Sequence, residues 1–179
     1  MIADNIADTD YIFLDSEKVP DDLKYGCRRS EFQYIPKDLS VLEADISCGG
    51  RLPDFMYDPE NYIPLISDRL KNLFDDMDIR NLFYRRVKII KKGESFSESY
   101  WLAVPPRIDC IDYEKSVIDE LFNETEILAI DEYKTGNYEI FKVSGAADSQ
   151  IIVTEKLKNT VEKYGFTEGF VFFDDENLI

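Results

Sequence analysis

The 179-residue chain is long enough for one domain with a sizeable core, and its 44% hydrophobic and 13% aromatic residues exclude a disordered chain. It carries 21 Lys and Arg against 37 Asp and Glu, and the resulting charge of −16 disfavours binding to nucleic acids and to anionic membranes. Histidine is absent, which removes the commonest general base and the commonest metal ligand.

The three cysteines predict buried thiols and no disulfide framework. Cys27, Cys48 and Cys110 are isolated along the chain, and an odd number cannot all pair within one molecule. The N-terminus has neither a basic region nor an apolar stretch of signal length, and no run approaches a membrane span. We therefore expect a cytoplasmic protein that needs no cofactor or metal ion.

The N-terminal part of the chain is weakly patterned. Residues 11–14 predict a strand, residues 19–22 predict a turn, and the Cys-Gly-Gly sequence at 48–50 marks a break. We expect residues 1–50 to form an N-terminal extension or an accessory segment of the domain that residues 51–179 comprise.

A first amphipathic helix is expected to begin after Ser67. Ser67 is a candidate N-cap, and Asp68 occupies the first helical position, where the helix dipole favours a negative charge. Apolar residues follow at helical spacing as far as Met77, and we expect the helix to end near Asp78.

Strands are expected after this helix. Residues 83–90 place Val87 and Ile89 on one face and Arg86 and Lys88 on the other. This basic stretch is either an anion site or, as we favour, a solvated strand face balanced by neighbouring acids.

Three later segments predict different kinds of structure. Residues 100–104 predict a strand that stops at the two prolines that follow it. Residues 127–133 and 138–143 predict a hairpin around residues 134–137. Residues 113–123 fit a helix face, and they fit a buried strand nearly as well.

A second capped helix near the C-terminus is similar to the first. Thr154 is its candidate N-cap, Gly165 is its expected stop, and residues 170–173 predict a final strand. Residues 66–72 align with residues 153–159 at an offset of 87, with three identities. A duplicated unit and the convergence of two capped helices both explain this alignment.

These elements predict an α+β fold. Its mostly antiparallel sheet carries the two similar capped helices on one side.

Three segments together resemble a known family. They are residues 64–71, residues 108–116, which contain the Asp-Cys pair at 109 and 110, and residues 152–158. Their order and spacing are similar to the bacterial immunity protein family eleven of polymorphic toxin systems, over roughly residues 53–173. The chain departs from that family's pattern in having leucine at 70 and 157, where phenylalanine is common, and two prolines at 105 and 106.

The resemblance implies that the chain neutralises a cognate toxin by binding it, which would protect the producing cell and its siblings. It implies no catalytic residues. The partner would be a toxin with a basic surface, which the negative charge would attract, and the chain itself would be a monomer or a weak homodimer. Acidic clusters and tyrosines near loops are the candidate partner-binding residues, namely Asp75, Asp76, Asp78, Asp131, Glu132, Tyr133 and Tyr138.

Two other functions stay open. A carboxylate-dependent hydrolase would need one pair of acids to stand out from the many present. An adaptor or self-associating protein would need residues 170–173 to form a sheet edge to which a second copy adds a strand. The segment with Asp109, Cys110 and Asp112 is read as structural, because neither histidine ligands nor an activating base accompany it.

Overall fold

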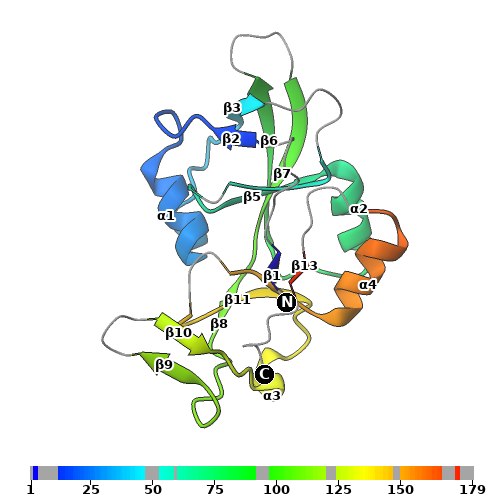
Figure 1. Cartoon of the computed structure of the whole chain (residues 1–179). Helices are drawn as coiled ribbons and strands as arrows, with labels where there is room; N and C mark the ends of the chain where they lie inside the picture. The colour runs from blue at the N-terminus through cyan, green and yellow to red at the C-terminus, as the bar shows by residue number, and fades with distance from the viewer. Residues whose placement is uncertain are drawn as a thin grey trace.

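The longest strands of the fold, β6 (Phe83–Lys91) and β7 (Ser97–Val104), pair at the centre of a six-stranded sheet (Figure 1). The computed structural model describes residues 2–3, 12–46, 53–58, 60–91, 97–119, 124–146, 150–166 and 172–173. The strand order is β2-β3-β6-β7-β5-β4, in which the β3–β6 pair is parallel and the other four pairs are antiparallel. The remaining strands are β2 (Ile12–Leu14), β3 (Val41–Ile46), β4 (Phe55–Asp58) and β5 (Ile63–Ser67).

The pleat of β6 confirms the alternation expected from the sequence. Val87 and Ile89 are buried, whereas Arg86 and Lys88 are exposed. The strand expected at residues 100–104 is also confirmed within β7, which ends directly before the two prolines.

The six-stranded sheet curls until its two edge strands meet. Asp58 in β4 accepts a hydrogen bond of 3.1 Å from the backbone N–H of Leu14 in β2. Side chains from both edges and from the central strands share one hydrophobic cluster inside the curl, including Leu14, Leu42, Met56, Leu65, Val87 and Leu102. Alternation in the strands therefore places the first core on the inner face.

Helix α1 (Asp21–Arg29) packs on this inner face through Leu23 and Cys27, and the short 3-10 helix η1 (Phe32–Tyr34) follows it. The turn expected at residues 19–22 is wrong in its second half, because Asp21 and Asp22 form the first turn of this helix. The start of α1 has no capping side chain, since Pro20 occupies the N-cap position.

The opposite face carries α2 (Asp68–Asp76) and α4 (Glu155–Lys163), which lie together on the other side of the sheet from α1 in Figure 1. Leu70 and Phe74 of α2 share a second core with Leu157 and Val161 of α4 and with Ala103 of β7. The expected fold, a mostly antiparallel sheet bearing two similar capped helices, is confirmed.

A second sheet lies beyond this core, with the order β13-β1-β12-β11-β8. Its β11–β8 pair is parallel and its other pairs are antiparallel. Among the described strands β13 occupies an edge of this sheet. The strands are β1 (Ile2–Ala3), β8 (Arg107–Ile108), β11 (Ile140–Val143), β12 (Ile152–Val153) and β13 (Phe172–Phe173).

The hairpin expected around residues 134–137 is wrong. Strand β10 (Glu124–Ile127) pairs instead with β9 (Val117–Asp119), and Ile130 forms a bridge with Ile111. The residues that follow form helix α3 (Glu132–Thr135), because the Asp131 side chain accepts the N–H of Tyr133 and so caps a helical turn. The ambiguous segment contains β9, while residues 120–123 lie outside the described part of the chain.

The two capped helices begin in the same way. Ser67 Oγ accepts the N–H of Leu70 at 3.1 Å, and Thr154 Oγ1 accepts the N–H of Leu157 at 3.3 Å. Both expected caps are therefore confirmed.

The helices also end in the same way, still at the offset of 87. Asp78 and Gly165 have positive φ angles of 59° and 74°, and the N–H of the next residue donates back into the helix. The acceptors are Phe74 O for Ile79, at 2.8 Å, and Val161 O for Phe166, at 3.0 Å.

The similarity extends to the hairpin before each helix. In the first unit Ser67 Oγ donates to Asp54, and the carboxylate of Asp54 lies 3.4 Å from Arg69. In the second unit the corresponding acid, cap and base are Glu139, Thr154 and Lys156. Each unit is thus a hairpin, a helix and a strand joined by the same acid–hydroxyl–base contacts.

Helix α1 is joined to the second sheet by basic side chains. Lys142 of β11 is fully buried, and its Nζ donates to the carbonyl of Cys27 at 3.0 Å. Arg107 of β8 donates to the carbonyl of Arg28 at 2.9 Å. In the part of the chain that the structure describes, no helix is both long and apolar enough to cross a membrane.

Candidate partner-binding surface

Helix α3 lies at one end of the molecule, at the bottom of Figure 1. Its start is capped by Asp131, and its last residue, Thr135, donates its hydroxyl to the Glu132 carbonyl at 2.8 Å. Lys134 donates to the Ile111 carbonyl at 3.2 Å and lies 3.7 Å from Asp131. This short helix is therefore held in place from both ends by side-chain contacts.

Tyr133 projects from α3 with its side chain 100% exposed, and Tyr138 just beyond the helix is 38% exposed. Because Tyr133 is fully exposed, it contributes no buried area to the fold. Aromatic side chains bury roughly 150 Å² or more on contact, which at about 25 cal/mol per Å² is on the order of 4 kcal/mol before costs. The tyrosine is thus available to a partner.

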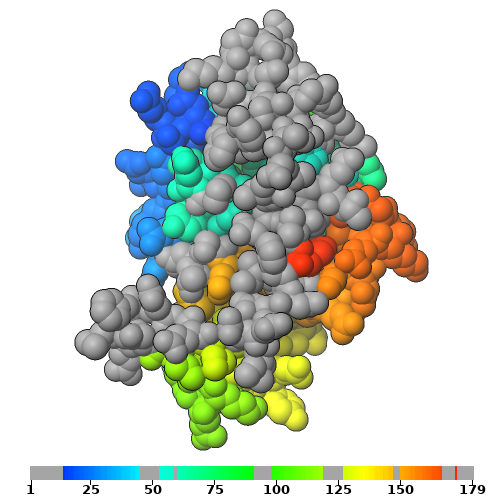
Figure 2. Space-filling view, in the orientation of Figure 1, coloured from blue at the N-terminus to red at the C-terminus, as the bar shows by residue number. Residues whose placement is uncertain are grey.

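Carboxylates lie near the start of α3. The N–H of Asp131 donates to the Cys110 carbonyl at 2.8 Å, which places Asp109 beside the start of α3. Asp109 and Glu132 are exposed, and neither has an ion pair within the described residues. Figure 2 shows the parts of the chain around β9 and α3 next to one another at this end of the molecule.

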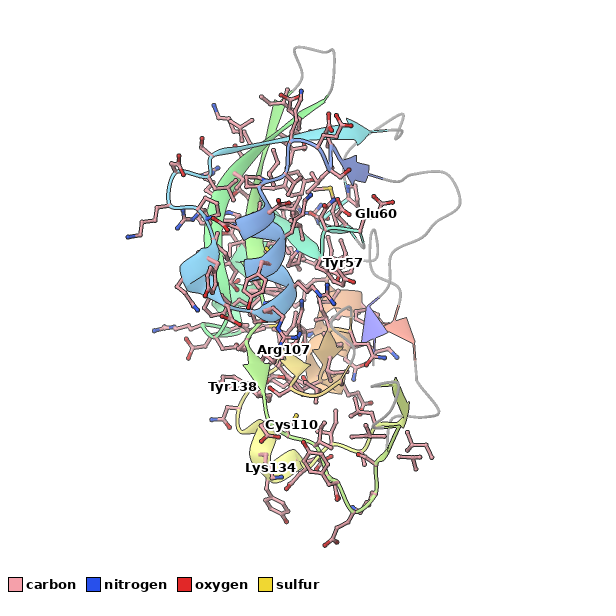
Figure 3. The ribbon with its side chains drawn as sticks, turned by 90° about the vertical axis from the view of Figure 1, so that its left-hand side faces the viewer. Tyr57, Glu60, Arg107, Cys110, Lys134 and Tyr138 are labelled. Carbon is pink, nitrogen blue, oxygen red and sulfur yellow. The ribbon has the colours of Figure 1, made fainter. Side chains whose placement is uncertain are left out.

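The pKa of the Cys110 thiol depends on its burial and on the charges around it. Burial, and then the carboxylates of Asp109 and Asp131, raise the pKa of its thiol to about 11, although Lys134 acts in the opposite direction. Figure 3 shows Cys110, Lys134 and Tyr138 gathered at this end, with Tyr57 and Glu60 further up the molecule. A thiol with so high a pKa is a poor nucleophile at neutral pH.

The neighbouring Asp112 stabilises a turn. It accepts the N–H of Glu114 and pairs with Lys115 at 3.1 Å. The hydrogen bond from Lys115 holds the pKa of Asp112 below its usual value. The buried Cys110 and this turn agree with the structural reading of the segment.

Cys27 is the other cysteine that the structure describes. It is buried on the face of α1 that packs against the sheet, and burial raises the pKa of its thiol to about 12 even though Lys142 acts to lower it. Cys48 lies outside the described residues.

The other predicted acids lie elsewhere, at the end of α2, which Figure 1 shows well away from α3. Asp75 pairs with Lys71 at 2.6 Å, and Asp78 pairs with Arg80 at 2.5 Å. Asp76 is exposed and has no ion pair within the described residues. The structure therefore brings together Asp131, Glu132, Tyr133 and Tyr138, but not the α2 acids with them.

A group of cationic and aromatic side chains beside α2 was not predicted. The Trp101 indole N–H donates to Asp68 at 2.7 Å, and Arg86 donates to the same carboxylate at 3.0 Å. The Lys71 ammonium lies 4.2 Å from the centre of the Tyr84 ring. Arg86 is balanced by an acid, as expected for a solvated strand face, and the group joins α2 to the outer face of the sheet.

No group of three or more acidic, histidine or cysteine side chains suited to a metal ion occurs among the described residues. The sequence profile of an immunity protein family (Imm11) matches residues 3–176. The chain belongs to this family. Membership in Imm11 supports an immunity function, and the match extends over the first 50 residues as well as the rest. Among curated proteins, no relative matches this Imm11 chain.

Proposed function

We propose that this Imm11 protein neutralises a cognate toxin by direct protein–protein binding in the cytoplasm, and so protects the producing cell and its siblings. The observation that carries the proposal is the family match over residues 3–176. The exposed tyrosine on α3 and the unpaired carboxylates beside it add a surface of the kind that protein partners bury.

We propose that neutralisation occurs without turnover. The chain has no histidine, and the two described thiols have pKa values far above neutral. The buried carboxylate of Asp58 serves the fold, because it accepts hydrogen bonds from Leu14 and from Asn61. A hydrolase built on this buried carboxylate would have to break those contacts.

The proposed partner has a basic surface. A protein with a formal charge of −16 attracts a cationic protein over distances of about 10 Å at 0.1 M salt and raises its association rate. The same charge repels nucleic acids and anionic membranes. We propose that the chain itself is a monomer or a weak homodimer, which light scattering of the purified protein tests.

Co-expression tests the proposal. The cognate toxin is expressed from an inducible promoter, with and without the chain, and a catalytically inactive toxin serves as the control. We expect growth arrest with the toxin alone, and full growth when the chain is present. Continued arrest with both proteins soluble would rule the proposal out.

A further inference from the structure

We infer that the toxin docks on the α3 surface, which we define as Asp109, Glu132, Tyr133 and Tyr138. Tyr133 is the anchor, which enters an apolar pocket of the toxin that basic side chains flank. The inference rests on the proposed function and assigns the contact face that function needs.

The α3 surface is preorganised. The Asp131 cap and the Lys134 bond to the Ile111 carbonyl fix the backbone from which Tyr133 projects. A tyrosine has few rotatable bonds, and its backbone here is already ordered, so little conformational entropy is lost when a partner covers it. Rigid aromatic anchors of this kind dominate measured interface energies.

The charges select a basic partner at this face. The carboxylates of Asp109 and Glu132 are exposed and have no ion pair within the described residues, so a cationic partner gains attraction without displacing an existing contact. At the end of α2, by contrast, Asp75 and Asp78 already pair with Lys71 and Arg80.

The other strongly exposed tyrosines are all less exposed than Tyr133. Tyr113 comes next at 65%, and the adjacent Asp112 already pairs with Lys115 at 3.1 Å. Tyr164 is 59% exposed, but the Lys163 ammonium lies over its ring, 5.6 Å from the ring centre, so this tyrosine already has a cationic partner. Tyr25 is 46% exposed, but it packs edge-on against Tyr34, with ring centres 4.9 Å apart. Tyr133 alone among the described large hydrophobic residues is fully exposed, and it lies beside unpaired acids.

The first experiment measures the dissociation constant between the purified full chain and the inactive toxin by calorimetry. We expect Tyr133→Ala to raise the Kd at least about thirtyfold, the effect typical of an interface anchor. The matched control is Tyr164→Ala, which removes an exposed tyrosine of a different face and is expected to change the Kd less than about threefold. Both variants should keep the wild-type melting temperature, since neither side chain is buried.

The second experiment separates the two acidic faces by association kinetics. We expect the double variant Asp109→Asn/Glu132→Gln to lower the association rate several-fold at low salt and to weaken its salt dependence. The matched control, Asp75→Asn/Asp76→Asn, should leave both quantities near wild type.

The outcomes are distinguishable. Wild-type affinity in Tyr133→Ala, or loss of binding only in the α2 double variant, would overturn the α3 surface while leaving the proposed function intact. A wild-type chain that neither binds the toxin nor restores growth would instead defeat the proposed function itself.

Discussion

Lys142 is fully buried in β11, and its ammonium group donates to the carbonyl of Cys27, 115 residues earlier in the chain. It lies in the run Ile140–Val143, which reads as an ordinary strand with one outward lysine. The sequence cannot reveal its burial, because only the tertiary position of α1 creates the carbonyl acceptors. Lys142 therefore illustrates why contacts between side chains of distant segments cannot be predicted from the sequence alone.

We predict that Lys142→Ala lowers the free energy of unfolding by about 2–4 kcal/mol, because it leaves a cavity and removes donors from buried carbonyls. Chemical denaturation checks this value. The control Lys88→Ala, at an exposed strand position, should stay within about 0.5 kcal/mol of wild type. Equal effects of the two substitutions would show that Lys142 does not stabilise the fold.

The two described thiols should be unreactive in the folded chain. At pH 8, raising the pKa from 9.0 to about 11 lowers the thiolate fraction of Cys110 about a hundredfold, and Cys27 falls further. A Cys48→Ser variant should therefore react with a thiol reagent at least that much more slowly when native than when denatured. Rapid native labelling of both thiols would contradict their burial.

The raised pKa values of the two thiols should make the stability of the fold depend on pH. Because the folded pKa of each thiol lies above its ordinary value, the unfolded chain ionises first, and stability should fall as the pH rises above about 9. Denaturation of the same Cys48→Ser variant at pH 8 and pH 10 measures this loss.

The helices show which elements are readable from sequence. Ser67 and Thr154 predict the starts of α2 and α4 correctly, because an N-cap bond is a local contact with the N–H of the residue three positions later. Helix α1 was missed because no side chain caps it. The hairpin around residues 134–137 was wrongly predicted because strand pairing, unlike a cap, depends on partners far along the chain.

Substitution of the two caps should have unequal effects. We predict that Thr154→Ala costs about 1 kcal/mol and that Ser67→Ala costs up to about 2 kcal/mol. Both caps also donate to an acid, but the acid that Ser67 bonds is the more deeply buried one. The side chain of Asp54 is 4% exposed, against 17% for Glu139, which Thr154 bonds. Thr160→Ala, inside α4, is the control and should be nearly neutral. A larger loss for Thr160→Ala than for either cap would exclude this explanation.

Glu139 should make the second unit sensitive to acid. Burial raises the pKa of Glu139, but hydrogen bonds from Lys156 and Thr154 outweigh it and hold that pKa below the ordinary 4.5. Its contribution is therefore present above about pH 4.5 and lost as the pH falls through the folded pKa. Glu139→Gln should flatten the decline in unfolding free energy between about pH 5 and pH 3, whereas the exposed Glu162→Gln should not.

The whole molecule was recognisable from its sequence in outline. The order of three segments indicated the family, and the profile match over residues 3–176 shows it. The sequence also predicted buried thiols, which the structure confirms for Cys27 and Cys110. Composition could not show which acidic cluster is best suited to bind a partner. The pairing of Asp75 with Lys71 and the exposure of Glu132 depend on the folded surface.

Direct binding and enzymatic inactivation differ in stoichiometry. Purified active toxin is titrated with the purified chain, while toxin activity and complex formation are followed in the same samples. We predict that activity falls in proportion to complex formed and reaches its minimum at one chain per toxin. Complete inactivation by a small fraction of an equivalent, with no complex detected, would contradict neutralisation by binding.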